Sequence, residues 1–211
     1  MDTMLIKLDW LIREYDLDIQ GVIHIGAHHG QEYEAYADHG VQNMMFFEPV
    51  KSTYTELVNR LPKSKNIKTY NIALGNEVGV RDMNIENHKG QSNSFLEPGT
   101  HLELRPDIQF TGKEEVRIAK LDCIPFDRKL YNMINIDVQG FELEVFKGAV
   151  DTLPFIDIIY AEVNFEEVYK DCCLVGVLDK FLSRFDFKRV FTRDSKNAKD
   201  RKTWGDALYV K

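Results

Sequence analysis

The stretch Val22-Ile23-His24-Ile25-Gly26-Ala27-His28-His29-Gly30 is an apolar run that ends in two glycines with three residues between them. A second apolar run ends in Phe46-Phe47-Glu48-Pro49, and Glu48 follows Gly30 by 18 positions. In a Rossmann-like βαβ unit, glycines let the backbone approach a nucleotide, and a carboxylate at the tip of the next strand accepts hydrogen bonds from the ribose hydroxyls. The pattern predicts a nucleotide site over Gly26 to Gly30, with Glu48 on the ribose.

The composition is that of a globular domain. The chain has 211 residues, of which 44% are hydrophobic and 29% charged, and one domain is expected over residues 1–211. The net charge of −7, with no basic block, argues against a nucleic-acid-binding face. No apolar run is long enough to span a membrane, and no signal-peptide pattern is present. Three cysteines without metal or disulfide spacing indicate a reducing compartment, so a cytoplasmic location is expected.

Strand and helix patterns alternate along the chain. Helices are expected over residues 3–15 (within an N-terminal segment, 1–19), 31–39, 52–60 with Ser52 as a cap, 141–148 and 173–184. Strands are expected over residues 21–25, 43–47, 67–72, 78–85, 114–121, 132–137, 156–163, 186–192 and 206–210. This alternation predicts an α/β fold with a mostly parallel sheet, helices on both faces, and a C-terminal antiparallel strand pair.

A polar segment over residues 86–112 interrupts this alternation. It contains turn signals from Gly, Pro, Asn and Ser, and the core of it, Asn87 to Thr111, is expected to be a loop. Long loops in compact domains are usually functional or mobile.

A second set of acids follows the later strands. Asp137 ends the run Met133 to Ile136, Glu142 opens the next helix, and Glu162 and Asn164 lie near the end of the following strand. The carboxyl ends of parallel strands meet at one edge of the sheet, so these groups should converge on one crevice. Converging carboxylates can divide into acid, base and binding roles.

Three histidines, His24, His28 and His29, invite a metal hypothesis. Nothing in their spacing fixes three imidazoles on one centre, and no carboxylate lies at a recognised ligand spacing. No metal site is therefore expected, and His28 is interpreted as a ligand-contacting or loop-orienting residue.

Over residues 20 to 165 the sequence resembles the FkbM family of S-adenosylmethionine-dependent methyltransferases. The matching landmarks are His24-Ile25-Gly26-Ala27-His28-His29-Gly30, Phe47-Glu48-Pro49, Asn71-Ile72-Ala73-Leu74-Gly75, Ser92-Asn93-Ser94, Leu121-Asp122, Ile136-Asp137-Val138-Gln139-Gly140-Phe141-Glu142, Lys147-Gly148-Ala149 and Ala161-Glu162-Val163. The family usually has Asp at position 24, Asn at 28 and Glu at 139, where this chain has His24, His28 and Gln139.

The resemblance implies a class I methyltransferase fold and S-adenosylmethionine as cofactor. It places the methionine and sulfonium end of the cofactor over the first loop, the ribose on Glu48, and the adenine near Asn71 to Ala73. The implied cofactor-binding residues are Gly26, Ala27, His28, Gly30, Glu32, Glu48, Asn71, Ala73 and Asp137. The implied reaction is O-methylation of a hydroxyl, most naturally on a sugar or glycan.

A hydroxyl is a weak nucleophile and needs a base. Asp137 is the first candidate, and Glu162, Glu142 and His28 are the others; a divalent ion on Asp137 and Glu162 is an alternative activator that the spacing does not support. The segment 86–112 would cover the acceptor, and Phe95 or Phe165 could stack on a sugar. The expected acceptor-binding residues are Ser92, Ser94, His101 and Asn164.

Two other readings stay open. An NAD-dependent oxidoreductase or epimerase would use the same fold, although a Gly-x-x-x-Gly spacing and the lack of a Tyr-x-x-x-Lys pair disfavour it. A non-catalytic binding module would explain His24 and Gln139, but not the retained Glu48, Asp137 and Glu162. The chain could also be one domain of a larger glycan-building protein.

Overall fold

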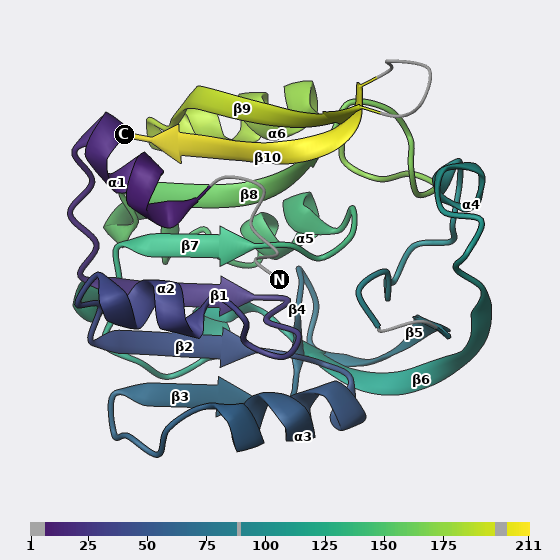
Figure 1. Ribbon diagram of the computed structural model, residues 1–211, viewed down its shortest axis with the longest axis horizontal. Coiled ribbons are helices and arrows are strands. Elements are labelled where there is room, and N and C mark those ends of the chain that lie inside the picture. Colours follow the sequence, from purple (N-terminus) through teal and green to yellow (C-terminus); the bar gives the residue numbers. More distant parts are fainter. Residues whose placement is uncertain (1–6, 88–89, 197–201) are drawn as a thin grey trace.

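The computed structural model describes residues 7–87, 90–196 and 202–211. A central sheet flanked by helices lies next to a smaller sheet (Figure 1). The helices are α1 (Leu8–Tyr15), α2 (Tyr33–Asp38), α3 (Lys51–Arg60), α4 (His101–Leu104), α5 (Glu142–Lys147) and α6 (Val175–Leu182). The strands are β1 (Gly21–Ile25), β2 (Asn43–Phe47), β3 (Ile67–Tyr70), β4 (Ala73–Leu74), β5 (Gly79–Glu86), β6 (Phe110–Ala119), β7 (Met133–Ile136), β8 (Ile158–Asn164), β9 (Lys188–Lys196) and β10 (Lys202–Val210).

The central sheet has the strand order β3-β2-β1-β7-β8-β10-β9. β10 is antiparallel to both of its neighbours, and the other described pairs of this sheet are parallel. The strand order reverses beside β1, and the crevice beyond the carboxyl ends at such a point is where open α/β sheets bind ligands. The predicted fold, with its antiparallel C-terminal pair, is confirmed.

Different helices cover the two faces of the central sheet. All five residues of β1 are buried, as expected for a parallel strand covered on both sides. Val22 belongs to one buried cluster with Leu11 of α1 and Leu57 of α3, whereas Ile23 belongs to a second with Phe146 of α5. Successive strand residues point to opposite faces, so both faces are apolar and the polar groups gather at the strand ends.

The smaller sheet has the order β4-β6-β5 and follows β3 in the chain. The pattern of residues did not predict β4, whose two residues pair with the end of β6. The expected loop Asn87 to Thr111 is also shorter than predicted. It contains the helical turn α4. Strand β6 begins at Phe110, because the polar residues Thr111 to Glu114 also pair with β5.

Helix and strand ends differ from the expected ones by a few residues. Ser52 does not cap α3: the helix begins one residue earlier, at Lys51, and its cap position Val50 makes no side-chain hydrogen bond. Residues 3–6 of the helix expected over 3–15 lie outside the described residues, and α1 begins at Leu8. None of the described helices is both long enough and apolar enough to cross a membrane.

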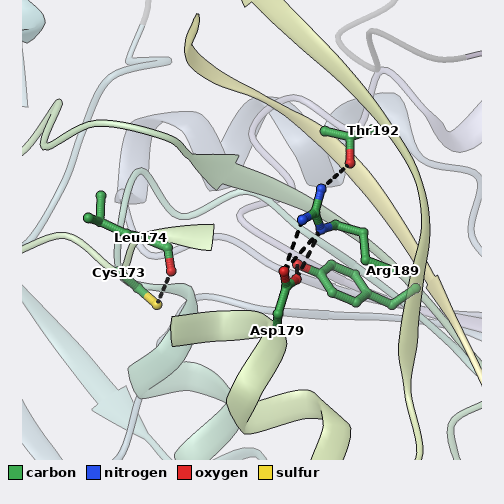
Figure 2. Close-up of polar contacts among 6 residues, drawn as sticks. Cys173, Leu174, Asp179, Arg189 and Thr192 are labelled. Atoms are coloured by element: carbon green, nitrogen blue, oxygen red, sulfur yellow. Dashed lines mark hydrogen bonds and ion pairs between the residues drawn. The ribbon is translucent and has the colours of Figure 1, made fainter. Parts of the chain in front are cut away.

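An ion pair ties α6 to the C-terminal strands (Figure 2). Arg189 of β9 donates from Nε to Oδ1 of Asp179 at 3.0 Å and from a terminal nitrogen to Oδ2 at 2.9 Å. Its other terminal nitrogen donates to Thr192 at 2.7 Å, and the Tyr209 hydroxyl donates to Asp179 at 2.9 Å. This clamp fixes the strands that complete the sheet beside β8.

Candidate active site

A cavity of about 420 Å³ lies beyond the carboxyl ends of β1, β2, β7 and β8. Its volume is in the range of small-molecule sites. We call the part of the cavity lined by Glu48 and Ala73 the β2 end, and the part lined by Asn164 and Trp204 the β8 end. Asp137 lies between them, as the order of the strands requires.

The turn after β1 is held against the tip of β2. The backbone N–H groups of Gly26 and Ala27 donate to the carbonyl oxygen of Phe47 at 3.0 and 2.9 Å. His28 has a left-handed φ of 48°, and its backbone N–H donates to Oε2 of Glu48 at 3.0 Å. The first loop and the acid of β2 therefore form one hydrogen-bonded unit.

Glu48 is nearly buried, and its Oε1 accepts a hydrogen bond from the backbone N–H of Val50 at 2.9 Å. Burial raises the pKa of Glu48 to about 7, although the N–H groups of Val50 and His28 lower it. Asn71 donates to the carbonyl oxygens of Glu48 and Pro49 at 3.0 and 2.8 Å. Asn71 thus holds the tip of β2 in place and does not line the cavity.

Beside Glu48 the wall of the cavity becomes apolar. It is formed by Ile72, Ala73, Leu74, Met83, Phe95 and Phe141. The rings of Phe95 and Phe141 lie 5.1 Å apart, and the Arg81 guanidinium stacks on both at 5.0 and 5.1 Å. A cation behind two aromatic rings stabilises them as a rigid wall, which suits a flat heteroaromatic ring.

A buried polar group forms the floor of the cavity under β1 and β7. Asn135 donates to the Tyr36 hydroxyl at 2.5 Å, and that hydroxyl lies 3.4 Å from Nδ1 of His24. Burial lowers the pKa of His24 to about 3, so its imidazole is neutral. Glu32 lies 4.0 Å from Nε2 of His24 and also lines the cavity. The floor is therefore polar, with Glu32 as its acidic residue.

Three carboxyl groups come together at the middle of the cavity, two of them in its wall and one behind it. Oxygens of Asp137, Glu142 and Glu162 lie within 4.8 Å of one another. The side-chain amide of Gln139 donates to Asp137 at 2.7 Å and to Glu162 at 3.0 Å. The Tyr169 hydroxyl donates to Oε1 of the same amide at 2.8 Å, which fixes its orientation. The prediction that acids of β7 and β8 converge is met by this geometry.

These carboxyl groups hold protons more tightly than usual. Asp137 is exposed to the cavity, and partial desolvation by the surrounding protein raises its pKa against the lowering effect of Gln139. Burial raises the pKa of Glu162 well above its ordinary value, and the nearby carboxylates of Asp137, Glu142 and Asp206 raise it further. The carboxyl groups of Asp137 and Glu162 lie close enough to influence each other, so the titration of one depends on the charge of the other.

Glu142 supports this site from below. It is 1% exposed and does not line the cavity. Its Oε1 accepts the backbone N–H groups of Val138 and Gly140, each at 3.1 Å. Burial raises the pKa of Glu142 to about 7. The residue predicted as a catalytic acid or base therefore positions the turn that carries Gln139.

The same geometry does not fit a resident divalent ion. The space between Asp137 and Glu162 is occupied by an N–H donor of Gln139, whose dipole would repel a cation. The inner oxygen of Glu142 is already bonded to two backbone N–H groups. The alternative in which a metal on Asp137 and Glu162 activates a hydroxyl is therefore disfavoured.

The β8 end of the cavity contains two buried polar atoms that need a partner. His101 is 6% exposed and Asn164 1%, and both line the cavity. Nδ1 of His101 and Nδ2 of Asn164 make no hydrogen bond with any described residue. Burial lowers the pKa of His101, as does nearby Arg105, and its ring lies 5.0 Å from that of Tyr169. A ligand with neutral hydrogen-bonding groups would satisfy both atoms.

Two segments far apart in the sequence build this end of the cavity. Backbone N–H groups of Gly99 and His101 donate to the carbonyl oxygen of Val168, and that of Lys170 to Glu97. Pro98 and Tyr169 also form a β-bridge. Segment 97–101, before β6, and segment 167–170, after β8, are thus joined by their backbones.

The structure brings most of the predicted site residues to one cavity. Those that line it are Gly26, Ala27, His28, Glu32, Glu48, Ala73, Ser92, His101, Asp137, Glu162 and Asn164. Gly30, Asn71, Glu142 and Ser94 do not line it. Ser94, expected to bind the acceptor, is 1% exposed and donates to the backbone oxygen of Gln139 at 2.9 Å, because it is needed to hold that turn.

Several lining residues had no signal in the sequence. Tyr169 and Trp204 lie in segments without periodicity, and Phe141 was taken only as a landmark of the helix start. Asp206 could have been found, because a lone acid beside the apolar run Ala207 to Val210 is unusual for a buried strand. It pairs in register with Glu162 and accepts the hydroxyl of Tyr160.

Comparisons with known proteins agree with this architecture. A family model described as the methyltransferase FkbM domain matches residues 24–189. A 2-O-methyltransferase of Sinorhizobium fredii, NoeI, is 23% identical over 181 residues, which cover 82% of this chain and 74% of NoeI. The fold resembles that of the methyltransferase FkbM from Methylobacillus flagellatus, with a TM-score of 0.57, 14% identity and 90% of this chain covered. It also resembles the magnesium protoporphyrin IX methyltransferase of Synechocystis PCC 6803, with a TM-score of 0.55, 10% identity, and 96% of this chain and 75% of that chain covered.

The chain belongs to the FkbM methyltransferase family, because the family model covers most of its length. The resemblance found in the sequence is confirmed. The chain spans 43% of the length of the Methylobacillus protein, so family membership is a statement about this domain.

Proposed function

We propose that this protein is an S-adenosylmethionine-dependent O-methyltransferase that acts on a hydroxyl of a sugar or glycan. Family membership supports methyl transfer, and the similarity to a 2-O-methyltransferase supports oxygen as the acceptor atom. The observation that carries the proposal is the position of Asp137 and Glu162. Their carboxyl groups face the cavity between the β2 end, proposed to hold the nucleoside, and the β8 end, where buried polar atoms of His101 and Asn164 make no hydrogen bond with any described residue.

The β2 end has the groups that this cofactor requires. Glu48 can accept hydrogen bonds from both ribose hydroxyls, and the wall around Phe95 and Phe141 suits adenine. Glu32, on the floor, is the candidate partner of the α-amino group. When bound, the cofactor supplies an electrophilic methyl group on a positively charged sulfur.

The β8 end supports a hydroxyl-rich acceptor. Nδ1 of His101 and Nδ2 of Asn164 are buried and unsatisfied, so an acceptor without hydrogen-bonding groups would leave two polar atoms unpaired. Trp204 adds an aromatic surface to the lining, as sugar-binding sites often have. In this proposal Ser92 and Asn93 complete the lining beside the acceptor.

The chain's own groups would act by alignment and proton removal. The walls hold the acceptor oxygen in line with the methyl carbon, which accounts for much of the rate. Asp137, paired with Glu162, takes the hydroxyl proton as the oxygen–carbon bond forms. Gln139 and Tyr169 keep the two carboxyl groups in this arrangement.

Two measurements test the proposal. Calorimetric titration with S-adenosylmethionine, S-adenosylhomocysteine and NAD, with and without EDTA, should show micromolar binding of the first two alone. Incubation with S-adenosylmethionine and a panel of glycosides, followed by mass spectrometry, should then show a gain of one methyl group on an oxygen. Binding of NAD alone would favour an oxidoreductase, and cofactor binding without turnover on any acceptor would favour a binding module.

A further inference from the structure

The carboxyl cluster of Asp137, Glu142 and Glu162 has no lysine or arginine partner among the residues that the structure describes. The groups that face the Asp137–Glu162 pair are Asp206 from β10, Tyr169 from the segment after β8 and Glu142 from α5, besides His28 from the loop after β1. Two of these neighbours, Asp206 and Glu142, are acids, so the local field favours retention of a proton.

The bridge made by Gln139 holds the two carboxyl groups close together, so the charge of each acts strongly on the other. Its amide donates to both carboxyl groups, at 2.7 and 3.0 Å, and holds them close enough to be hydrogen-bonded to each other. Gln139 has a φ of 54°, a left-handed conformation that is unfavourable for a side chain of this size. The chain keeps this residue in a strained turn, which is consistent with a functional constraint on its amide.

The two forms of the cofactor differ by one charge at this place in the proposed site. S-adenosylmethionine carries a positive sulfonium, whereas S-adenosylhomocysteine carries a neutral thioether. A positive charge close to a carboxyl pair favours the ionised form of that pair.

We infer that binding of S-adenosylmethionine expels the proton shared by Asp137 and Glu162 to solvent, and that the emptied pair receives the proton of the acceptor hydroxyl. In the transfer, the bond between oxygen and the methyl carbon forms. The bond between sulfur and that carbon breaks with its electron pair left on sulfur, and the hydroxyl proton moves to the pair. S-adenosylhomocysteine then leaves a protonated site. This cycle rests on the proposed function.

Calorimetry in buffers of different ionisation enthalpy counts the protons without any acceptor or turnover. S-adenosylmethionine should release about one more proton per site than S-adenosylhomocysteine near pH 7. Sinefungin, in which a cationic amine replaces the sulfonium, should behave like S-adenosylmethionine. Both cofactor forms carry the same ribose, so any proton exchanged by Glu48 is the same for both. This contribution cancels when the two proton counts are subtracted.

Variants assign the released proton. Glu162→Gln should bind both cofactor forms and lose the difference in proton release. Glu115→Gln, an exposed acid on β6, is the matched control and should keep it. If Glu162→Gln does not fold, as judged by circular dichroism, Asp137→Asn provides the same test.

Three results would overturn the inference. Equal proton release by both cofactor forms would show that the sulfonium charge does not expel a proton. If the difference in proton release were lost in His28→Asn but kept in Glu162→Gln, the proton would belong to His28. Either result would refute the proton cycle and leave the proposed function standing. No binding of either form would instead refute the proposed function, and this inference with it.

Discussion

A β-carbon on Gly26 would lie 1.8 Å from the backbone carbonyl oxygen of Asp137. The turn after β1 therefore touches the tip of β7 through backbone alone. Gly26 also has a φ of +77°, where a side chain is strained whatever the space. The loop beside Glu48 and Asp137 at the tip of β7 are held in register by this contact.

Gly26→Ala should push the first loop away from β7 and abolish measurable binding of S-adenosylhomocysteine in calorimetry. Gly176→Ala is the matched control, because Gly176 lies in α6 with open space around its β-carbon position. The control should bind normally and melt at the same or a slightly higher temperature, since alanine favours helix. Normal binding by Gly26→Ala would show that the loop can move without cost.

Asp137→Asn should lower kcat for methyl transfer by about 10²- to 10⁴-fold, the usual contribution of a general base, with cofactor affinity largely retained. The measurement is single-turnover transfer to whichever glycoside the panel identifies. Asp82→Asn, at an exposed position of β5, should leave kcat unchanged. Turnover near the wild-type rate in Asp137→Asn would remove this residue from the mechanism.

Cofactor affinity should depend on pH through Glu48. Its carboxylate, with a pKa of about 7, accepts hydrogen bonds from ribose hydroxyls better when ionised, so affinity for S-adenosylhomocysteine should rise between pH 6 and 8. Glu48→Gln should bind about 10- to 100-fold more weakly at pH 8, as expected for loss of charge-assisted hydrogen bonds. It should also lose the pH dependence, and a pH slope that persists in this variant would contradict the assignment.

The stability of the fold should fall as the pH rises toward 8, in part because of Glu142. Its pKa is raised by burial from 4.5 to about 7, so folding takes up a proton between these values. The stabilisation is fully present below pH 4.5 and is lost as the pH passes 7. Urea unfolding should show that the free energy of unfolding falls between pH 5 and pH 8. In Glu142→Gln this fall should be smaller than in the wild type by on the order of 1–3 kcal/mol. An identical loss in both proteins would mean that Glu142 titrates normally.

The Asp179–Arg189 clamp should contribute modestly to stability. Both side chains are about one third exposed, so the double-mutant cycle of Asp179→Ala and Arg189→Ala should give a coupling energy of about 1 kcal/mol in unfolding experiments. Cofactor binding should not change, because neither residue lines the cavity. Strictly additive losses would show that the pair has no mutual stabilisation.

The strands and the acids at their tips could be predicted from the sequence for a simple reason. β1 and β2 have the predicted bounds, because parallel strands buried on both faces are continuous apolar runs. The carboxyl ends of such strands share one edge, so the acids that end them, Glu48, Asp137 and Glu162, were bound to meet in one crevice.

The supporting residues could not be predicted in the same way. From the sequence, Glu142 is interpreted as a catalytic acid or base, or as a partner of the helix dipole. Its hydrogen bonds to backbone N–H groups depend on the turn at Gln139 and Gly140, both of which have positive φ values. Tyr169 reaches Gln139 from an irregular segment 30 residues further along the chain, which leaves no period to detect. Long-range side-chain contacts of this kind depend on tertiary structure, not on local pattern.

The backbone hydrogen bonds between segments 97–101 and 167–170 limit how the β8 end of the cavity could be altered by exchanging segments. Grafting only one segment from a relative whose backbone follows a different path would leave the N–H groups of Gly99, His101 and Lys170, or their acceptors, without partners. If this end of the cavity binds the acceptor as proposed, the two segments form one unit of specificity, and we expect that a chimaera must exchange both together to keep this wall closed.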